Sequence, residues 1–341
     1  MVAKIDPASC LVTGATGVVG PRLVKALVDK GFKVRVLVRQ TPPPDLLPAG
    51  VTTVLGDLLD VDALQQATSG IYVVFHLAAK LHINNPDAAL EDEYRRVNVD
   101  GTRLLLDKSL AAGVRRFVYF STINVYGLSH PGQVFSEIDN PAPDGIYAQT
   151  KYDAERFVVD ARNPETLAPI GIVLRLAAMY GPHMKGNYPR LIRAIRRGLF
   201  IPLGRGLNRR TLVHERDVVA AAMLAAEHPA AAGQVYNVTD GQIHTFGEIM
   251  AAICQVLNKP LPRFYLPTNL VRFLAGVAED VFRLAGKRSP IVRATVDKLT
   301  EDVAVSGEKF QREMNFQPQF DLVEGWKDTM RHWREEKQER G

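Results

Sequence analysis

A tyrosine and a lysine stand four residues apart in the run YAQTK, as Tyr147 and Lys151. On a helix this spacing places both side chains on one face. A phenol with a pKa of about 10 exchanges protons poorly at neutral pH, but a neighbouring ammonium favours its ionised form. Thr122, with Ser121 as the adjacent alternative, follows an expected strand over 116–120 and can hold the same substrate oxygen. This set predicts proton exchange with an alcohol or a carbonyl, coupled to hydride transfer.

A glycine-rich turn near the N-terminus predicts the site of the hydride carrier. An expected strand over 10–12 runs into TGATGVVG (13–20), and apolar residues at helical spacing follow over 21–28. Gly14 permits the tight turn, Gly17 lets the backbone approach a pyrophosphate, and Gly20 allows close packing of helix and strand. The glycine spacing alone also suits an ordinary turn, so the flanking strand and helix carry the prediction. Further contacts are expected from Thr16, Val18 and Val19.

The residue after the second expected strand bears on the choice of cofactor. An acid at this place accepts hydrogen bonds from the adenosine ribose, whereas an arginine pairs with a 2′-phosphate. This chain has Arg39, and no acid follows until Asp45. The pattern favours NADP(H) over NAD(H), the alternative being a solvated arginine.

Two later strand ends complete the expected cofactor site. Asp57 follows the strand over 52–55 and is placed to reach the adenine amino group. The strand over 71–75 ends in small residues, which leave room for the cofactor at the carboxyl edge of the sheet. His76 lies in an apolar run and is expected to be structural. The remaining cofactor candidates here are Leu58, Leu77, Ala78 and Ala79.

The chain resembles the extended short-chain dehydrogenase/reductase superfamily, including its epimerase/dehydratase group. The matching stretches are TGATGVVG, GDLLD, HLAA, VNVDGT, FSTINVYG, YAQTK and RLAAMYGP, which span nearly the whole chain. The resemblance implies that Tyr147 is the acid–base residue and that Lys151 lowers its pKa and binds the nicotinamide ribose. It also makes Thr122 the partner hydroxyl and Asn98 a support of the cofactor site.

The resemblance implies an α/β fold with a Rossmann-type, doubly wound parallel sheet and a smaller, mainly helical C-terminal substrate lobe. We expect residues 1–178 to form the NAD(P)-binding domain, with 212–240 returning to it. The lobe then comprises 179–211 and 241–341. Sugar 4,6-dehydratases carry Thr-Asp-Glu where this chain has Thr122-Ile123-Asn124, so dehydration is not expected.

The second lobe carries the excess positive charge. Between Lys185 and Arg216 nine cations face one acid, Glu215, whereas the whole chain carries +5. Such a cluster can attract an anionic substrate, although a solvated helix face is the plainer interpretation. By resemblance to nucleotide-sugar enzymes, Asn187 and Arg210 contact a diphosphate. The other candidates for substrate contact are Lys80, Thr122 and Asn124.

We therefore expect an NADPH-dependent 4-keto-sugar reductase acting on a nucleotide-diphosphate sugar. The alternatives are a nucleotide-sugar 4-epimerase, a 3-beta-hydroxysteroid dehydrogenase-like enzyme and a non-enzymatic NADP sensor. Nucleic-acid binding is disfavoured because aromatic residues are sparse within the basic cluster.

Composition bounds the remaining expectations. The chain has 341 residues, 46% of them hydrophobic, and its two cysteines show neither metal spacing nor a disulfide framework. We expect a cytoplasmic homodimer without a metal or a signal peptide. Residues 268–286 form a broad apolar face, for which core or oligomer packing is the commoner explanation and peripheral membrane contact the rarer one.

Overall fold

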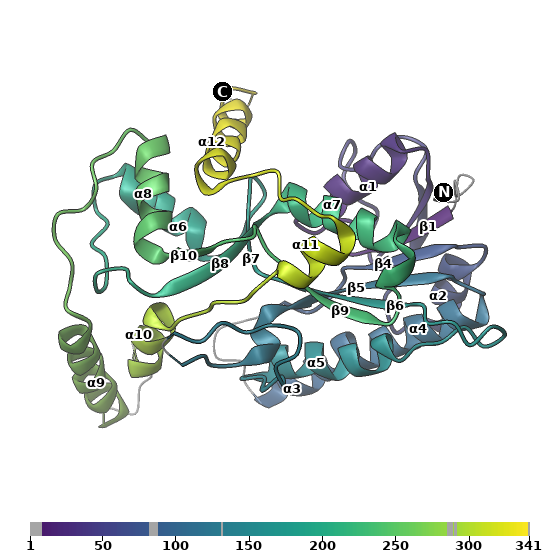
Figure 1. Cartoon of the computed structure of the whole chain (residues 1–341), viewed down its shortest axis with the longest axis horizontal. Coiled ribbons are helices and arrows are strands. Elements are labelled where there is room, and N and C mark those ends of the chain that lie inside the picture. The colour runs from purple at the N-terminus through teal and green to yellow at the C-terminus, as the bar shows by residue number, and fades with distance from the viewer. Residues whose placement is uncertain (1–8, 82–87, 131, 285–288, 290–291, 340–341) are drawn as a thin grey trace.

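Seven parallel strands form the main sheet, in the order β3-β2-β1-β4-β5-β6-β9. The computed structural model describes residues 9–81, 88–130, 132–284, 289 and 292–339. The chain runs outward from β1 to β3 and then returns to β4, so the strand order reverses between β1 and β4, where open α/β sheets bind ligands. The expected Rossmann-type sheet is confirmed (Figure 1). The strands are β1 (Ser9–Thr13), β2 (Lys33–Val38), β3 (Thr52–Leu55), β4 (Val73–His76), β5 (Arg116–Thr122), β6 (Gly171–Leu176) and β9 (Gln234–Val238).

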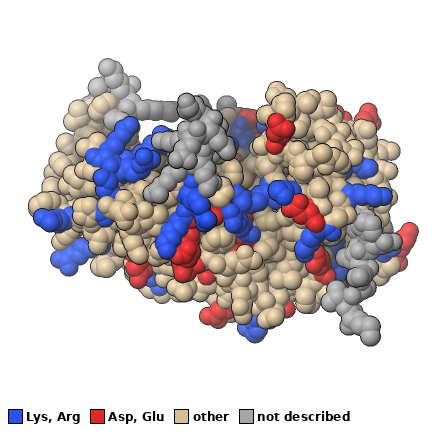
Figure 2. Space-filling view, turned by 90° about the horizontal axis from the view of Figure 1, so that it is seen from above, with Lys and Arg blue, Asp and Glu red and all other residues tan. Residues whose placement is uncertain are grey.

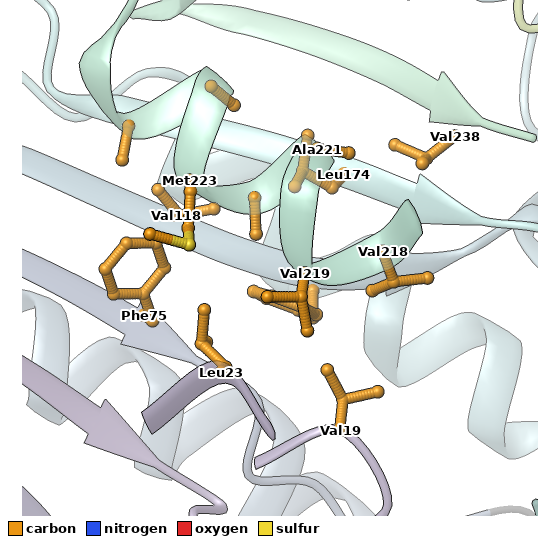
Figure 3. Close-up of a cluster of buried hydrophobic side chains, with 14 of the residues drawn as sticks. Val19, Leu23, Phe75, Val118, Leu174, Val218, Val219, Ala221, Met223 and Val238 are labelled. Carbon is orange, nitrogen blue, oxygen red and sulfur yellow. The ribbon is translucent and has the colours of Figure 1, made fainter. Parts of the chain in front are cut away.

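Helices cover both faces of this sheet, which is why its strands are apolar on both sides. α1 (Gly20–Asp29) and α7 (Glu215–Glu227) pack on one face. Figure 3 shows Leu23 and Met223 from these helices beside Phe75 and Val118 of the sheet. α2 (Val61–Thr68), α4 (Gly101–Ala111) and α5 (Ile146–Val159) cover the other face. α3 (Ala88–Arg95) and a π-helical turn, η1 (Arg96–Asp100), lead into α4.

A smaller lobe is built on a three-stranded sheet in the order β10-β8-β7, which comprises β10 (Ile243–Thr245), β8 (Arg209–His214) and β7 (Ala178–Tyr180). Three helices share a core with this sheet that includes Tyr180, Ile249 and Trp326. They are α6 (Asn187–Arg196), α8 (Phe246–Val256) and α12 (Leu322–Glu339). Thus β8 joins the small sheet, while α7 and β9 after it return to the main body.

The remaining helices are short or peripheral. α11 (Glu308–Met314) packs through Phe310 on the main body. α9 (Thr268–Leu284) and α10 (Arg293–Thr300) lie side by side at the edge of the molecule (Figure 1). The apolar face expected over 268–286 is exposed in the single chain, so it is not part of the core; residues 285, 286 lie outside the described part.

Leu23→Ala is expected to lower the free energy of unfolding by about 2–5 kcal/mol, because the side chain is fully buried between α1, α7 and the sheet. Leu55→Ala is the matched control, since Leu55 is 57% exposed, and should change stability by less than about 0.5 kcal/mol. Urea unfolding followed by circular dichroism measures both. Equal losses in the two variants would contradict this packing.

Candidate functional site

The backbone of the glycine turn packs closely against the loop after β4, and the two ends of the turn pack against each other. Gly14 has a φ of +71°, and a Cβ there would lie 2.7 Å from the backbone nitrogen of Ala78. A Cβ on Gly20 would lie 2.3 Å from the Gly14 carbonyl oxygen. Thr16 and Gly17 are exposed at the outer lip of the turn. α1 begins without a side-chain cap and without an acid in its first turn, so its positive end suits a pyrophosphate.

His76 is a buried structural residue at the strand-order reversal. Its Nδ1 lies 2.7 Å from Thr13 Oγ1, and its Nε2 lies 2.9 Å from Thr102 Oγ1. Because the Thr102 hydroxyl donates to the Asn98 carbonyl, it must accept from Nε2–H, which leaves Nδ1 to accept from Thr13. Burial lowers the pKa of His76 to about 3, so the ring is neutral and joins β1, β4 and α4.

Asn98 fixes the start of α5 relative to the loop after β4. Its Oδ1 accepts from the Lys80 backbone nitrogen at 2.7 Å, and its Nδ2 donates to the Lys80 carbonyl at 3.2 Å. The same Nδ2 donates to Thr150 Oγ1 at 3.1 Å, and the Thr150 hydroxyl donates to the Tyr147 carbonyl at 3.0 Å. The amide therefore holds the first turn of α5 against the edge where the cofactor is expected.

Tyr147 and Lys151 lie on one face of α5, as their spacing predicts. Lys151 is buried with its Nζ 4.0 Å from the centre of the Tyr119 ring. Burial lowers the pKa of Lys151 to about 7, and Glu155 acts in the opposite direction. Burial, with a smaller contribution from Tyr94, raises the pKa of Tyr147 to about 12. These shifts apply to the protein alone, and the expected lowering of the Tyr147 pKa by Lys151 stays a prediction.

A buried ion pair holds the middle of α5 to the sheet. Arg175 on β6 donates to Glu155 Oε2 through Nη2 at 2.7 Å and through Nε at 3.0 Å. The two side chains are 5% and 2% exposed. Arg175 also lies 4.8 Å from the Tyr126 ring, and the Tyr126 hydroxyl donates to Asn237 Oδ1 at 2.9 Å. The network reaches from α5 across β6 to β9.

The same network separates the two hydroxyls that end β5. Ser121 Oγ donates to the Glu155 carboxylate, so its proton is engaged. Thr122 Oγ1 accepts from the Asn124 backbone nitrogen at 3.2 Å, which leaves its own proton to be donated. The geometry thus favours Thr122 over Ser121 as the hydroxyl for a substrate oxygen. Sequence reasoning missed Glu155 and Arg175; the signals were an acid four residues after Lys151 and an arginine within an apolar strand.

An open hollow of about 480 Å³ lies at the ends of β2 and β3. Arg39 lines it together with Arg96 from η1, which sequence reasoning missed. Asp57 accepts a hydrogen bond from the Leu59 backbone nitrogen at 2.7 Å, and Asp60 caps α2. Both carboxylates are therefore engaged with backbone. The lining comprises Arg39, Gly56, Asp57, Leu59, Asp60 and Arg96.

Tyr188, which follows Asn187 at the start of α6, lies near the guanidinium of Arg210. Asn187 is the first residue of α6 and is exposed. Arg210 on β8 is half-buried and donates to the Leu299 carbonyl at 3.3 Å. Burial lowers the pKa of Arg210, whereas the neighbouring Tyr188 raises it. The start of α6 and the Arg210 guanidinium therefore border the same region.

Two further expected substrate contacts, Lys80 and Asn124, have different neighbours from Asn187 and Arg210. The Lys80 ammonium forms an ion pair with Glu93 and lies 5.5 Å from the centre of the Tyr94 ring. Asn124 belongs to the short helix η2 (Ile123–Tyr126), whose first turn Thr122 caps. Lys80 is thus occupied by α3, the helix that precedes η1.

The described residues contain neither a candidate metal-ion site nor a membrane-spanning helix. No group of three or more His, Cys, Asp and Glu residues there could hold a metal ion. Within the same part of the chain, no helix is both long and apolar enough to span a membrane.

The parallel sheet, the glycine turn at its strand-order reversal and the Tyr-Lys pair on α5 define a dinucleotide-dependent enzyme of the extended short-chain dehydrogenase/reductase type. The sequence profile of the NAD dependent epimerase/dehydratase family matches residues 10–239. The chain belongs to this family. Its relatives there are oxidoreductases or epimerases, and the protein is an enzyme of this class.

Individual relatives show the range of substrates in this family. The chain is 30% identical to UDP-glucose 4-epimerase of Vibrio cholerae over 95% of its own length and 94% of that protein. It is 29% identical to 3 beta-hydroxysteroid dehydrogenase/Delta 5→4-isomerase of Mycobacterium tuberculosis, over 91% and 86%. Among solved structures, MoeE5 in complex with UDP-glucose and NAD is 29% identical, with a TM-score of 0.73 over 96% of this chain and 99% of that chain.

These comparisons confirm the NAD(P) family and the fold, and they leave NADP preference and the 4-keto-sugar substrate as predictions. The residue roles, domain bounds, cytoplasmic location and homodimer also remain predictions.

Glu155→Gln is expected to lower the pKa of the Lys151 ammonium further below about 7, because the carboxylate that favours the charged form is gone. The 13Cε resonance of Lys151, assigned by its absence in Lys151→Met, reports this titration. Asp153→Asn is the matched control on the same helix, since its side chain bonds Gln149 and Arg95 instead. Identical Lys151 titrations in wild type and Glu155→Gln would contradict the electrostatic role.

Proposed function

We propose that the protein is an NADPH-dependent reductase that acts on the 4-keto group of a nucleotide-diphosphate sugar. The observation that carries the proposal is the position of Tyr147, Lys151 and Thr122. Thr122 ends β5, Lys151 lies against Tyr119 of the same strand, and Tyr147 is one turn before Lys151 on α5.

Each residue of the proposed site has a separate role in reducing a ketone. The glycine turn would hold a nicotinamide cofactor, which would supply the hydride for the carbonyl carbon. Thr122 donates a hydrogen bond to the carbonyl oxygen, and the Tyr147 hydroxyl gives that oxygen its proton. Lys151, with a pKa lowered by burial to about 7, can carry a positive charge that stabilises the phenolate left behind.

The choice of NADPH is supported by the two arginines at the hollow beyond β2 and β3. Arg39 and Arg96 both line it, and the acids beside them, Asp57 and Asp60, are engaged with backbone nitrogens. A 2′-phosphate between two guanidinium groups gains charge-assisted hydrogen bonds that an unphosphorylated ribose lacks. An exchangeable NADPH suits net reduction, whereas an epimerase returns its hydride to the substrate.

A diphosphate substrate is supported by the charge of the second lobe. Arg210 and the start of α6 border one region through Tyr188, and 185–216 carries nine cations against one acid. The planar guanidinium fork can bind two phosphate oxygens at once. UDP-glucose is bound by MoeE5, which has the same fold.

A steroid-like substrate is the second candidate. It is favoured by the exposed apolar side chains around α9 and by the similarity to the M. tuberculosis 3 beta-hydroxysteroid dehydrogenase. The Tyr147/Lys151 pair would serve either substrate.

Arg39→Asp is expected to weaken NADPH binding by roughly 1.5–3 kcal/mol and NADH binding far less, because a charge-assisted contact to the 2′-phosphate is lost. Arg96→Gln should change the two affinities in the same sense. Calorimetric titration with each cofactor measures this, and Arg103→Gln on α4, whose guanidinium lies over Phe157, is the control. Equal losses for both cofactors would remove the phosphate role.

Arg210→Gln is expected to weaken binding of a nucleoside diphosphate by tenfold or more, since a charged hydrogen bond contributes about 1.5–3 kcal/mol. Isothermal titration with UDP, dTDP and GDP identifies the base, and Arg312→Gln on α11, outside the basic stretch, is the matched control. If no diphosphate binds while a sterol quenches NADPH fluorescence, the sugar substrate is wrong and the second candidate holds.

A further inference from the structure

Exposed apolar side chains gather on α9 and the loops beside it. More than half of the exposed large apolar side chains that the structure describes lie in 199–207 and 261–281. On α9 they recur every three or four residues and so share one face of the helix. Their exposed fractions lie between 46% and 66% for Leu270, Phe273, Leu274, Val277 and Val281.

The two stretches lie side by side. Gly204 donates to the Leu266 carbonyl at 2.9 Å, and Leu266 donates to the Pro202 carbonyl at 2.9 Å. Arg205 Nε bonds the Tyr265 hydroxyl at 3.2 Å. We call the joined surface the docking face. It comprises the five α9 residues above with Ile201, Leu207, Phe264 and Tyr265.

The side of α9 opposite the exposed apolar residues packs against α10, and this contact fixes the orientation of the helix. Ala275 is buried, and a Cβ on Gly276 would meet the Arg293 guanidinium at 2.3 Å. Arg293 also bonds Asp280 at 3.0 Å and the Glu279 carboxylate at 3.5 Å. α9 is therefore packed against the start of α10, and the opposite face is left to solvent (Figure 1).

The chain around the docking face is basic. Residues 185–207 contain six cations and no acid, and residues 256–281 contain three cations and two acids, Glu279 and Asp280, which both pair with Arg293. Arg272 is paired with Asp297 at 2.7 Å. Within the described ranges, no carboxylate forms an ion pair with Arg190, Arg193, Arg196 or Arg197. Figure 2 shows Lys and Arg side chains over the end of the molecule that carries α6 and α8, whereas α9 lies on the side turned away from that view.

We propose that the docking face binds an anionic lipid bilayer, with α9 lying in the plane of the interface. Apolar side chains enter the boundary of the acyl chains, and neighbouring cations attract anionic headgroups. A second copy is disfavoured because a two-fold contact places the same patch on both sides, so that like charges oppose each other. A nucleic acid would use the cations and leave the apolar face uncovered. The proposal stands on this surface alone and is independent of the proposed function.

Co-sedimentation of the full chain with vesicles of phosphatidylcholine and phosphatidylglycerol tests the proposal, with pure phosphatidylcholine vesicles for comparison. We expect binding to the anionic vesicles that weakens as salt rises. The double variant Phe273→Glu/Leu274→Glu should lower the partition constant by tenfold or more. Ile138→Glu, at an apolar residue that is 94% exposed elsewhere, is the matched control and should leave it unchanged.

The double variant Arg196→Glu/Arg197→Glu should also lower partitioning to anionic vesicles by about tenfold or more. Far-ultraviolet circular dichroism and thermal unfolding are measured in every variant to show that it is folded. Failure of the wild type to bind anionic vesicles overturns the proposal. So does equal binding by wild type and Phe273→Glu/Leu274→Glu, or a wild-type dimer in gel filtration that this variant dissociates, because a second copy then covers the face.

Discussion

The buried contact between Glu155 and Arg175 determines how α5, which carries Tyr147 and Lys151, meets the sheet. Removing two charges from water is costly, and the cost is offset only when the geometry is good and the remaining lone pairs are bonded. Here Arg175 binds the carboxylate through two nitrogens, and Ser121 donates to the other oxygen. α5 is therefore fixed in both height and rotation over β5 and β6, which fixes Tyr147 and Lys151 as well.

This arrangement leaves the acid–base pair incomplete in the protein alone. The Lys151 ammonium is buried against an aromatic ring with one nearby carboxylate, and its pKa falls to about 7. The Tyr147 pKa rises to about 12 because its phenolate is equally difficult to bury. An additional positive charge beside the phenol lowers the cost of ionising it. We expect the oxidised cofactor to provide that charge, so that the tyrosine becomes reactive only in the complex.

Sequence patterns were sufficient for the elements and for the residues whose role depends on local spacing. The glycine turn, the shared face of Tyr147 and Lys151, the end of β5 at Thr122 and the structural character of His76 all follow from neighbours in the chain. Glu155 and Arg175 are 20 residues apart and meet only because β6 pairs with β5. Arg96 and Arg39 are 57 residues apart in the sequence and line one hollow only in the folded chain. Contacts between residues so far apart in the sequence depend on tertiary packing, which cannot be read from one sequence alone.

The central claim is that the Tyr147 phenol is tuned by the charges beside it. The ultraviolet absorbance of its phenolate tests this directly, as the titration of wild type minus that of Tyr147→Phe among the ten tyrosines of the chain. We predict that NADP+ lowers the pKa of Tyr147 well below its value in the protein alone, that NADPH does so far less, and that Lys151→Met raises the pKa of Tyr147 in the NADP+ complex. Identical titrations with NADP+, with NADPH and without cofactor would contradict the account.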